Sequence, residues 1–213
     1  MNFDSLAQLV GGLPCFDLAL LTQAFTVKRP VLRVQLSRWM KEGKVIGLRR
    51  GMYMLSDTYR RVPLNTAVLA NQLYGPSYLS GLWALGYYDM IPERVVWFTS
   101  VTSRVPRRFE NPVGVFEYRN IKQANFFGYG SRKVGDQDAM VADPEKALLD
   151  HWHLTPGEWT LPRLTEMRYQ HVDCVSRERL KDYAARFNSA RLNRAMERWV
   201  KLIAEETEGW VTV

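Results

Sequence analysis

The chain has 213 residues, of which 46% are hydrophobic and 24% charged, a composition ordinary for a globular protein that excludes a disordered, collagen-like or low-complexity chain. Its length suits one large domain or two small ones. The formal net charge is +7, and residues 1–60 alone hold nine basic and four acidic side chains. A basic N-terminal segment of this kind indicates a polyanionic partner.

The sequence carries no recognisable export or membrane signal. Residues 13–21 form the first apolar stretch, but Asp17 interrupts it and no basic residue precedes it. No run reaches the 18 or so apolar residues that a membrane-spanning helix requires. Cys15 and Cys174 are far apart in the sequence, and we expect both to be reduced, buried thiols. These features predict a cytoplasmic protein with no membrane partner.

The first 58 residues have the pattern of a winged helix-turn-helix domain. Asp17 is a suitable N-cap for a second helix, Pro30 fits only the first turn of a third, and Gly43 suits its left-handed C-terminal cap. A tight turn at 49–51 then separates two short apolar strands. The pattern predicts helices over 3–10, 18–25 and 30–42 and strands over 44–48 and 52–55.

The third predicted helix has one apolar and one polar face. At 100° per residue, a core stripe forms from Leu32, Leu36, Trp39 and Met40. The DNA-facing residues are predicted to be Val31, Val34, Ser37, Arg38 and Lys41, with Gln35 on the flank. In the DNA major groove, arginine pairs with guanine, glutamine with adenine, and apolar side chains contact thymine methyl groups.

Basic residues also flank this helix. The predicted phosphate contacts are Lys28, Arg29, Arg49 and Arg50, at the preceding turn and at the tip of the hairpin. The alternative interpretation is a module that docks proteins and whose basic residues are merely solvated. Agreement between charge, helical register and hairpin favours DNA binding.

Residues 59–213 are predicted to form a mixed α/β domain with a helical C-terminal part. Residues 56–63 have the composition of a linker. Helices are expected over 64–74, 75–86, 145–152, 177–187 and 190–206, and strands over 95–102, 113–118, 126–132 and 139–142. The fold class is therefore α/β, with an N-terminal winged helix-turn-helix followed by this second domain.

Several segments resemble the AbiEi family of bacterial antitoxins. The most specific is Asp-Pro-Glu-Lys-Ala-Leu-Leu-Asp at 143–150, and Phe-Phe-Gly-Tyr at 126–129 precedes it. Further similar segments are 48–53, 76–86 and 91–99, so that the resemblance spans about residues 15–155 in the family's order. The C-terminal helices match only as a basic helical tail.

This resemblance implies an antitoxin of a type IV toxin–antitoxin system, a class associated with phage defence. Such an antitoxin represses its own operon by binding double-stranded promoter DNA through the winged helix. Its C-terminal domain neutralises a nucleotidyltransferase-like toxin, often without a stable complex. The family's DNA-contacting helix and wing correspond to residues 31–41 and 49–50 here.

A metal-dependent nuclease is the enzymatic alternative. Asp138, Asp143, Glu145 and Lys146 form a carboxylate–lysine group, but Glu145 and Lys146 are adjacent in a predicted helix and diverge by 100°. We instead expect Asp143 and Glu145 to stabilise the helix N-terminus, residues 147–149 to pack inward, and Lys146 to be solvated or paired. We therefore expect that the protein is not an enzyme and has no catalytic residues.

No cofactor or metal site is expected either. His151 and His153 are two apart on a predicted helix and do not share a face, and His171 is distant. No phosphate-binding loop or nucleophile elbow occurs.

Two further groups of residues have open interpretations. Arg104, Arg107 and Arg108 form a possible secondary basic patch in an apparent loop, which extends a DNA footprint, meets an RNA-like or acidic surface on a toxin, or is solvated. The arginines of the last helices alternate with acids, which favours a solvated face. The aromatic residues Trp83, Tyr87, Tyr88, Trp97 and Phe98 are expected in the core. A stand-alone transcriptional regulator without antitoxin activity remains the alternative within the DNA-binding class.

Overall fold

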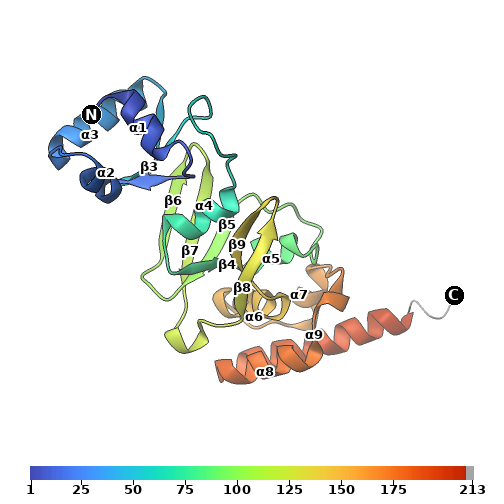
Figure 1. Ribbon diagram of the computed structural model, residues 1–213. Coiled ribbons are helices and arrows are strands. Elements are labelled where there is room, and N and C mark those ends of the chain that lie inside the picture. Colours follow the sequence, from blue (N-terminus) through green and yellow to red (C-terminus); the bar gives the residue numbers. More distant parts are fainter. Residues whose placement is uncertain (210–213) are drawn as a thin grey trace.

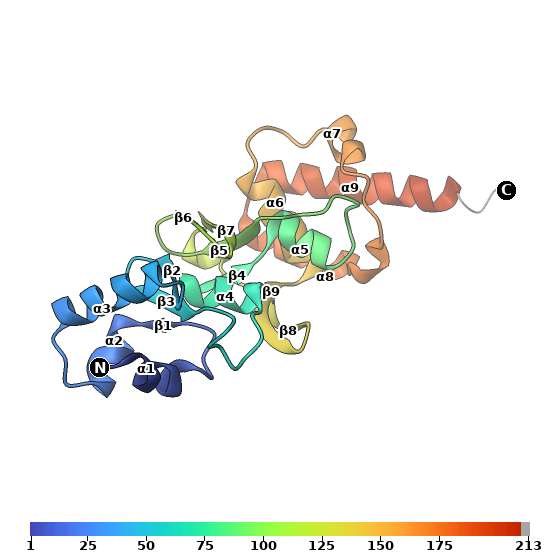
Figure 2. The same ribbon diagram turned by 90° about the horizontal axis from the view of Figure 1, so that it is seen from above.

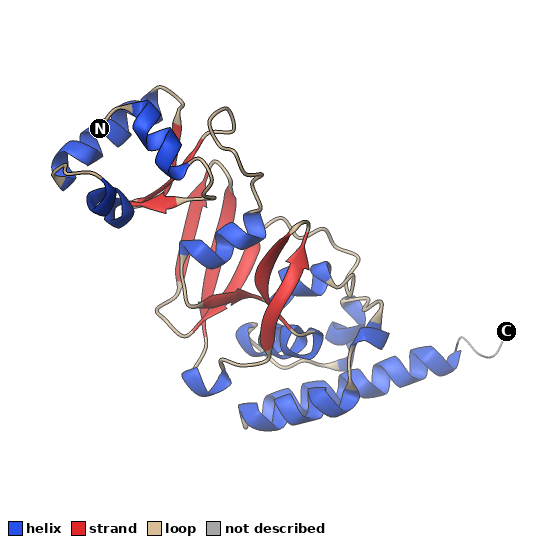
Figure 3. Ribbon diagram, in the orientation of Figure 1, coloured by secondary structure: helices blue, strands red, loops and turns tan. Residues whose placement is uncertain are grey.

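The computed structural model describes residues 1–209, with side chains as far as Glu205. The fold is mixed α/β with two β-sheets. An N-terminal unit lies at one end of an elongated molecule, and the long C-terminal helix projects from the other end (Figure 1). A six-stranded sheet occupies the middle (Figure 3).

The N-terminal unit forms as its local sequence signals predict. Asp17 Oδ1 accepts a hydrogen bond of 2.8 Å from the Leu20 backbone N–H, which caps the second helix. Pro30 lies in the first turn of the third helix, and Gly43 follows that helix with φ of +69°. The elements are α1 (Phe3–Val10), β1 (Phe16–Asp17), α2 (Leu18–Ala24), α3 (Arg29–Lys41), β2 (Val45–Arg49) and β3 (Met52–Leu55). The strands form an antiparallel sheet in the order β1-β3-β2.

The β2–β3 hairpin contributes to two hydrophobic cores. Val45 and Leu55 pack with α1, α2 and α3. Leu48, Met52 and Met54 are buried in the core of the second unit instead. Side chains alternate between the two faces of a strand, so one hairpin has one face in each core. The N-terminal unit is therefore not covered by its own residues alone.

The larger sheet has the strand order β6-β7-β5-β4-β9-β8. Its strands are β4 (Ser77–Leu79), β5 (Phe98–Thr102), β6 (Arg107–Asn111), β7 (Gly114–Asn120), β8 (Tyr129–Val134) and β9 (Gln137–Ala142). The pairs β5–β7 and β4–β9 are parallel, and the other neighbours are antiparallel. The sheet is mixed, as a long chain with both hairpins and helical crossovers allows.

Helices cover both faces of this sheet. The Tyr118 hydroxyl donates to the Ala70 carbonyl in α4 (Thr66–Leu73). The Tyr78 hydroxyl donates to Asp150 in α6 (Pro144–Leu154). In the strand register, Tyr78 lies opposite Val101 and Tyr118 lies opposite Ser100. Ser100 and Val101 are consecutive residues of β5, so their side chains point to opposite faces. The two tyrosines therefore point to opposite faces, with α4 on one side and α6 on the other (Figure 2).

The remaining helices include α5, which lies between β4 and β5, and the helices at the C-terminal end of the chain. They are α5 (Gly81–Tyr87), α7 (Leu161–Glu166), α8 (Arg177–Phe187) and α9 (Ala190–Gly209), with short 3₁₀ turns η1 (Gln123–Asn125) and η2 (Val172–Cys174). The predicted range of α8 agrees with the structure, and α9 begins where predicted. Among the helices of residues 1–209, none has the length and apolar character needed to cross a membrane.

Several sequence predictions of secondary structure and burial are wrong. Residues 77–79 form strand β4 rather than the start of a helix, because they pair with the distant strands β5 and β9. Arg107 and Arg108 lie in edge strand β6 rather than in a loop, because β7 supplies their backbone partners. Cys174 is exposed rather than buried, and Cys15 is only partly covered, although both are free thiols as expected.

Candidate nucleic-acid interface

The outer face of α3 carries five of the residues that the helical register predicts there. The side chains of Val34 and Val31 are 71% and 48% exposed, and Ser37, Arg38 and Lys41 are also exposed. The opposite face buries Leu32, Leu36 and Trp39, as predicted. Met40 was expected in this buried stripe, but it is 37% exposed beside Gly47 of the hairpin.

A shallow hollow of about 430 Å³ runs along this face. It is lined by Arg33, Val34, Ser37, Arg38 and Lys41, with three basic side chains and no acid among these described residues. Arg33 was not among the predicted contacts, although its i, i+4 relation to Ser37 places both on one side of a helix. The surface around Val34 is therefore basic.

Gln35 lies on the flank of α3 and does not line this hollow. Its side chain is partly buried, and its Nε2 donates a hydrogen bond of 2.9 Å to the Met1 carbonyl. The amide thus ties α3 to the N-terminal segment. Gln35 therefore differs from the other α3 side chains predicted to face DNA, which are exposed.

An ion-pair network lies at the C-terminal end of α3. The Glu42 carboxylate lies 2.8 Å from both Lys44 Nζ and Arg38 Nε. Hydrogen bonds from Lys44 and then Arg38 lower the pKa of Glu42, and Glu42 in turn raises the pKa of Lys44. The Arg38 side chain is nonetheless 77% exposed, so its guanidinium retains donors that face solvent.

The two arginines at the end of β2 are arranged differently. Arg50 is exposed in the turn between the strands. Arg49 is partly buried, and its Nε donates a hydrogen bond of 2.6 Å to the Leu73 carbonyl. Lys28 and Arg29 are exposed at the N-terminus of α3. The structure therefore leaves Lys28, Arg29 and Arg50 open to solvent and directs Arg49 toward the second unit.

The secondary basic patch is largely engaged in contacts within the protein. Arg104 Nη1 donates to the Gly75 carbonyl, and its guanidinium lies 4.6 Å from the centre of the Tyr74 ring. Arg108 pairs with Glu110 at 3.2 Å and lies over Trp97. Arg107 is exposed on edge strand β6. The three arginines do not form a free basic surface.

Lys146 is fully buried and paired, so of the two expected states, solvated or paired, the structure shows the second. Its ammonium pairs with Asp150 one turn further along α6 and bonds to the Tyr78 hydroxyl. Asp150 also accepts from Tyr78 and Ser80. Burial lowers the pKa of Lys146, and Asp150 opposes this shift. The ammonium also faces the rings of Phe127 and Phe187, so it is enclosed.

The acids at the start of α6 are also engaged. Asp143 accepts from Arg132 at 2.6 Å and from Tyr183 at 2.9 Å, and makes no side-chain cap. Glu145 Oε1 accepts from the Ser176 backbone N–H at 2.6 Å. Both acids lie at the N-terminus of α6 as expected, Asp143 as the N-cap residue and Glu145 in the first turn, and they also bond to β8, α8 and the residue before α8. The inward packing of residues 147–149 is confirmed.

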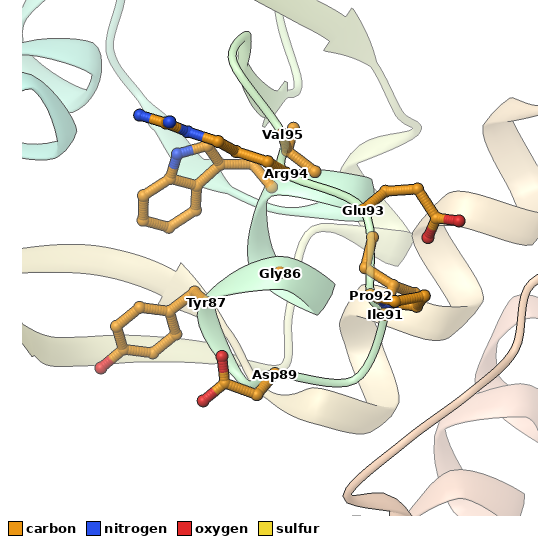
Figure 4. Close-up of a pocket in the computed structure, with 9 residues that line it drawn as sticks. Gly86, Tyr87, Asp89, Ile91, Pro92, Glu93, Arg94 and Val95 are labelled. Carbon is orange, nitrogen blue, oxygen red and sulfur yellow. The ribbon is translucent and has the colours of Figure 1, made fainter.

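A second hollow, of about 380 Å³, lies between α5 and residues 89–95 (Figure 4). Trp83 and Tyr87 line it with parallel rings, 5.8 Å apart between centroids. Figure 4 shows the carboxylates of Asp89 and Glu93 pointing to different sides, and Glu93 pairs with Arg168. The hollow therefore presents no paired carboxylates.

Trp97 is 48% exposed, which corrects its predicted place in the core. Trp83, Tyr87, Tyr88 and Phe98 are partly buried against the core.

Within the part of the chain that the structure describes, no group of three or more His, Cys, Asp or Glu side chains is arranged to hold a metal ion. No protein family model matches the chain, and no curated protein sequence matches it.

Proposed function

We propose that this protein is a DNA-binding transcriptional repressor that acts as the antitoxin of a type IV toxin–antitoxin operon in the cytoplasm. Residues 1–58 act as a winged helix-turn-helix, with α3 as the recognition helix and the β2–β3 hairpin as the wing. Residues 59–213 neutralise a nucleotidyltransferase-like toxin. The protein works without a cofactor and without catalysis of its own.

One observation carries the DNA-binding part of the proposal. The hollow on α3 combines Arg33, Arg38 and Lys41 with two solvent-exposed small side chains, Val34 and Ser37. An exposed helix of this kind fits the major groove, where its side chains meet base edges. The basic residues at both ends of α3 and at the wing supply the charge that phosphates neutralise.

The antitoxin part rests on the resemblance. The segments that carry it converge in the second unit: Tyr78 and Ser80 of one segment and Asp150 of another share hydrogen bonds, and the Lys146 ammonium faces the Phe127 ring. Buried charged groups persist where their partners satisfy them. The shared motif therefore has a structural role here, as the polar centre of the second unit. It offers no exposed carboxylate–lysine pair for a nuclease.

The DNA-binding part is tested by the affinity of the full chain for duplex DNA from upstream of its own gene and for an unrelated duplex, over a series of salt concentrations. The variant Arg33→Ala/Lys41→Ala should weaken binding to both duplexes. It should also reduce the slope of log affinity against log salt concentration (the salt slope) by about two. The matched control is Arg177→Ala, an exposed arginine on α8, which should bind as the wild type. Affinity that does not depend on salt would favour the protein-docking alternative.

The antitoxin part is tested by bacterial growth when the adjacent gene is induced alone and together with this protein from an unrelated promoter. Growth should stop and then recover, and the Arg33→Ala/Lys41→Ala variant should also restore it because repression plays no part. A harmless neighbouring gene, or failure of rescue with both proteins present, would reduce the function to that of a stand-alone regulator.

A further inference from the structure

The exposed valines of α3 have a second consequence. Val34 is the most exposed of the large hydrophobic side chains described, at 71%, and Val31 is 48% exposed one turn earlier. Both lie on a helix face whose other members are basic or hydroxylic. At such a position the isopropyl group of valine stays in contact with water. Its apolar surface is buried only when a binding partner covers it.

The geometry points to C5-methyl groups of thymine as that partner, which is an inference that rests on the proposed DNA-binding function. We infer that Val34 and Val31 distinguish base pairs by apolar contact with thymine methyls in the major groove. The thymine methyl is the apolar group that the major-groove edge of a base pair presents. Valine has no hydrogen-bond donor or acceptor with which to select the other bases.

The polar side chains nearby leave this role to the valines. Gln35, which would have paired with adenine, is bonded to the Met1 carbonyl on the flank. Ser37 forms hydrogen bonds with several bases and discriminates poorly. Arg38 donates from Nε to Glu42 and keeps its Nη donors free for a neighbouring guanine, but these donors do not select thymine. On the exposed face of α3, the two valines thus provide the apolar part of base recognition, which selects thymine.

The spacing of the valines defines the arrangement of thymines. Residues three apart on a helix lie on one face, about 4.5 Å apart along its axis. The two side chains therefore enter the same short stretch of groove. We expect the preferred duplex to carry two thymines close together, on one strand or on both.

The experiment uses the full chain and a duplex that it enriches from a random pool. The same duplex is then synthesised with deoxyuridine in place of every thymidine, which removes only the C5-methyl groups. Loss of one methyl contact should weaken binding about fourfold, so we expect wild-type affinity to fall roughly tenfold or more when both contacts are lost. Val31→Ser/Val34→Ser should bind the two duplexes within twofold of each other.

The matched control is Val96→Ser, a valine of similar exposure (67%) before β5, which should keep the wild-type ratio between the two duplexes. Because all three valines are exposed, each variant should unfold at the wild-type denaturant midpoint. The inference is overturned if the wild type binds both duplexes equally, or if Val31→Ser/Val34→Ser keeps the wild-type ratio; in either case DNA binding itself stands. If no duplex is enriched, the proposed DNA-binding function fails together with the inference.

Discussion

The Arg49 guanidinium donates from Nε to the Leu73 carbonyl oxygen over 2.6 Å, and so joins the end of β2 to the last turn of α4. Asn111 Nδ2 makes a similar bond to the Leu48 carbonyl at 3.1 Å. Both bonds connect the hairpin of the first unit to the second. An arginine that the sequence assigns to DNA phosphates thus has a partner inside the protein.

The adjacent arginines should therefore respond differently to substitution. Arg49→Ala should lower the free energy of unfolding by about 1–3 kcal/mol, because a hydrogen bond from a charged donor is lost and the Leu73 carbonyl is left without it. Arg50→Ala should change the unfolding free energy by less than about 0.5 kcal/mol. In duplex binding, Arg50→Ala should reduce the salt slope by about one. The assignment fails if Arg49→Ala reduces the salt slope and leaves stability intact.

The buried pair of Lys146 and Asp150 should be costly to break from one side. Lys146→Met leaves a buried carboxylate without its cation and should lower the unfolding free energy by about 3–5 kcal/mol. Lys146→Met/Asp150→Asn should be less destabilising than the single variant, because no uncompensated charge is left. Chemical denaturation of the full chain measures both. A single variant within 1 kcal/mol of the wild type would contradict the buried ion pair.

Gly128 and Gly43 form a matched test of steric fit. Both have φ of +69°, but a Cβ at Gly43 meets nothing within 4 Å, whereas one at Gly128 comes within 2.7 Å of Tyr183 Cε2. Gly43→Ala should cost about 1–2 kcal/mol for the left-handed backbone alone. Gly128→Ala should cost at least about 1 kcal/mol more, because Tyr183 must move. Equal unfolding midpoints for the two variants would show that the Gly128 site is looser than described.

His151 should make stability depend on pH. Burial, and then the charge of Arg163, lower its pKa to about 4, below the usual value of about 6.5 for histidine. The unfolded chain therefore binds a proton more readily than the folded one between these values, so folding loses stability as the pH falls from 6.5 toward 4. The loss should approach about 3 kcal/mol below pH 4.

The test for His151 is the unfolding free energy as a function of pH. His151→Leu should remove part of the pH dependence in that range, because His153, whose pKa burial also lowers, remains. His171→Leu, at an exposed site, should leave the profile in place. If both variants retain the wild-type profile, other groups cause the acid sensitivity.

Local signals predicted the N-terminal helices well. Asp17, Pro30 and Gly43 act within a few residues of themselves, and the structure shows each in its expected role. The exposed positions of α3 also follow from helical geometry alone. Met40 and Gln35 are the exceptions, because their environment depends on the hairpin and on Met1, which helical periodicity does not represent.

Non-local partners explain what the sequence did not reveal. Strand β4 is fully covered and only three residues long, so it shows no alternation, and it forms because β5 and β9 flank it. Lys146 is buried because Tyr78, 68 residues away, and Phe187 enclose it. The position of Lys146 in α6 gives no indication of partners so distant.

Because the hairpin contributes to two cores, it becomes fully packed only late in the synthesis of the chain. Leu48, Met52 and Met54 emerge from the ribosome well before strand β6, which contacts β2. Until that later part of the chain is complete, the hairpin face that carries Leu48, Met52 and Met54 stays exposed to water. We therefore expect full-length molecules, rather than nascent or prematurely terminated chains, to present the proposed DNA-binding surface in its folded form.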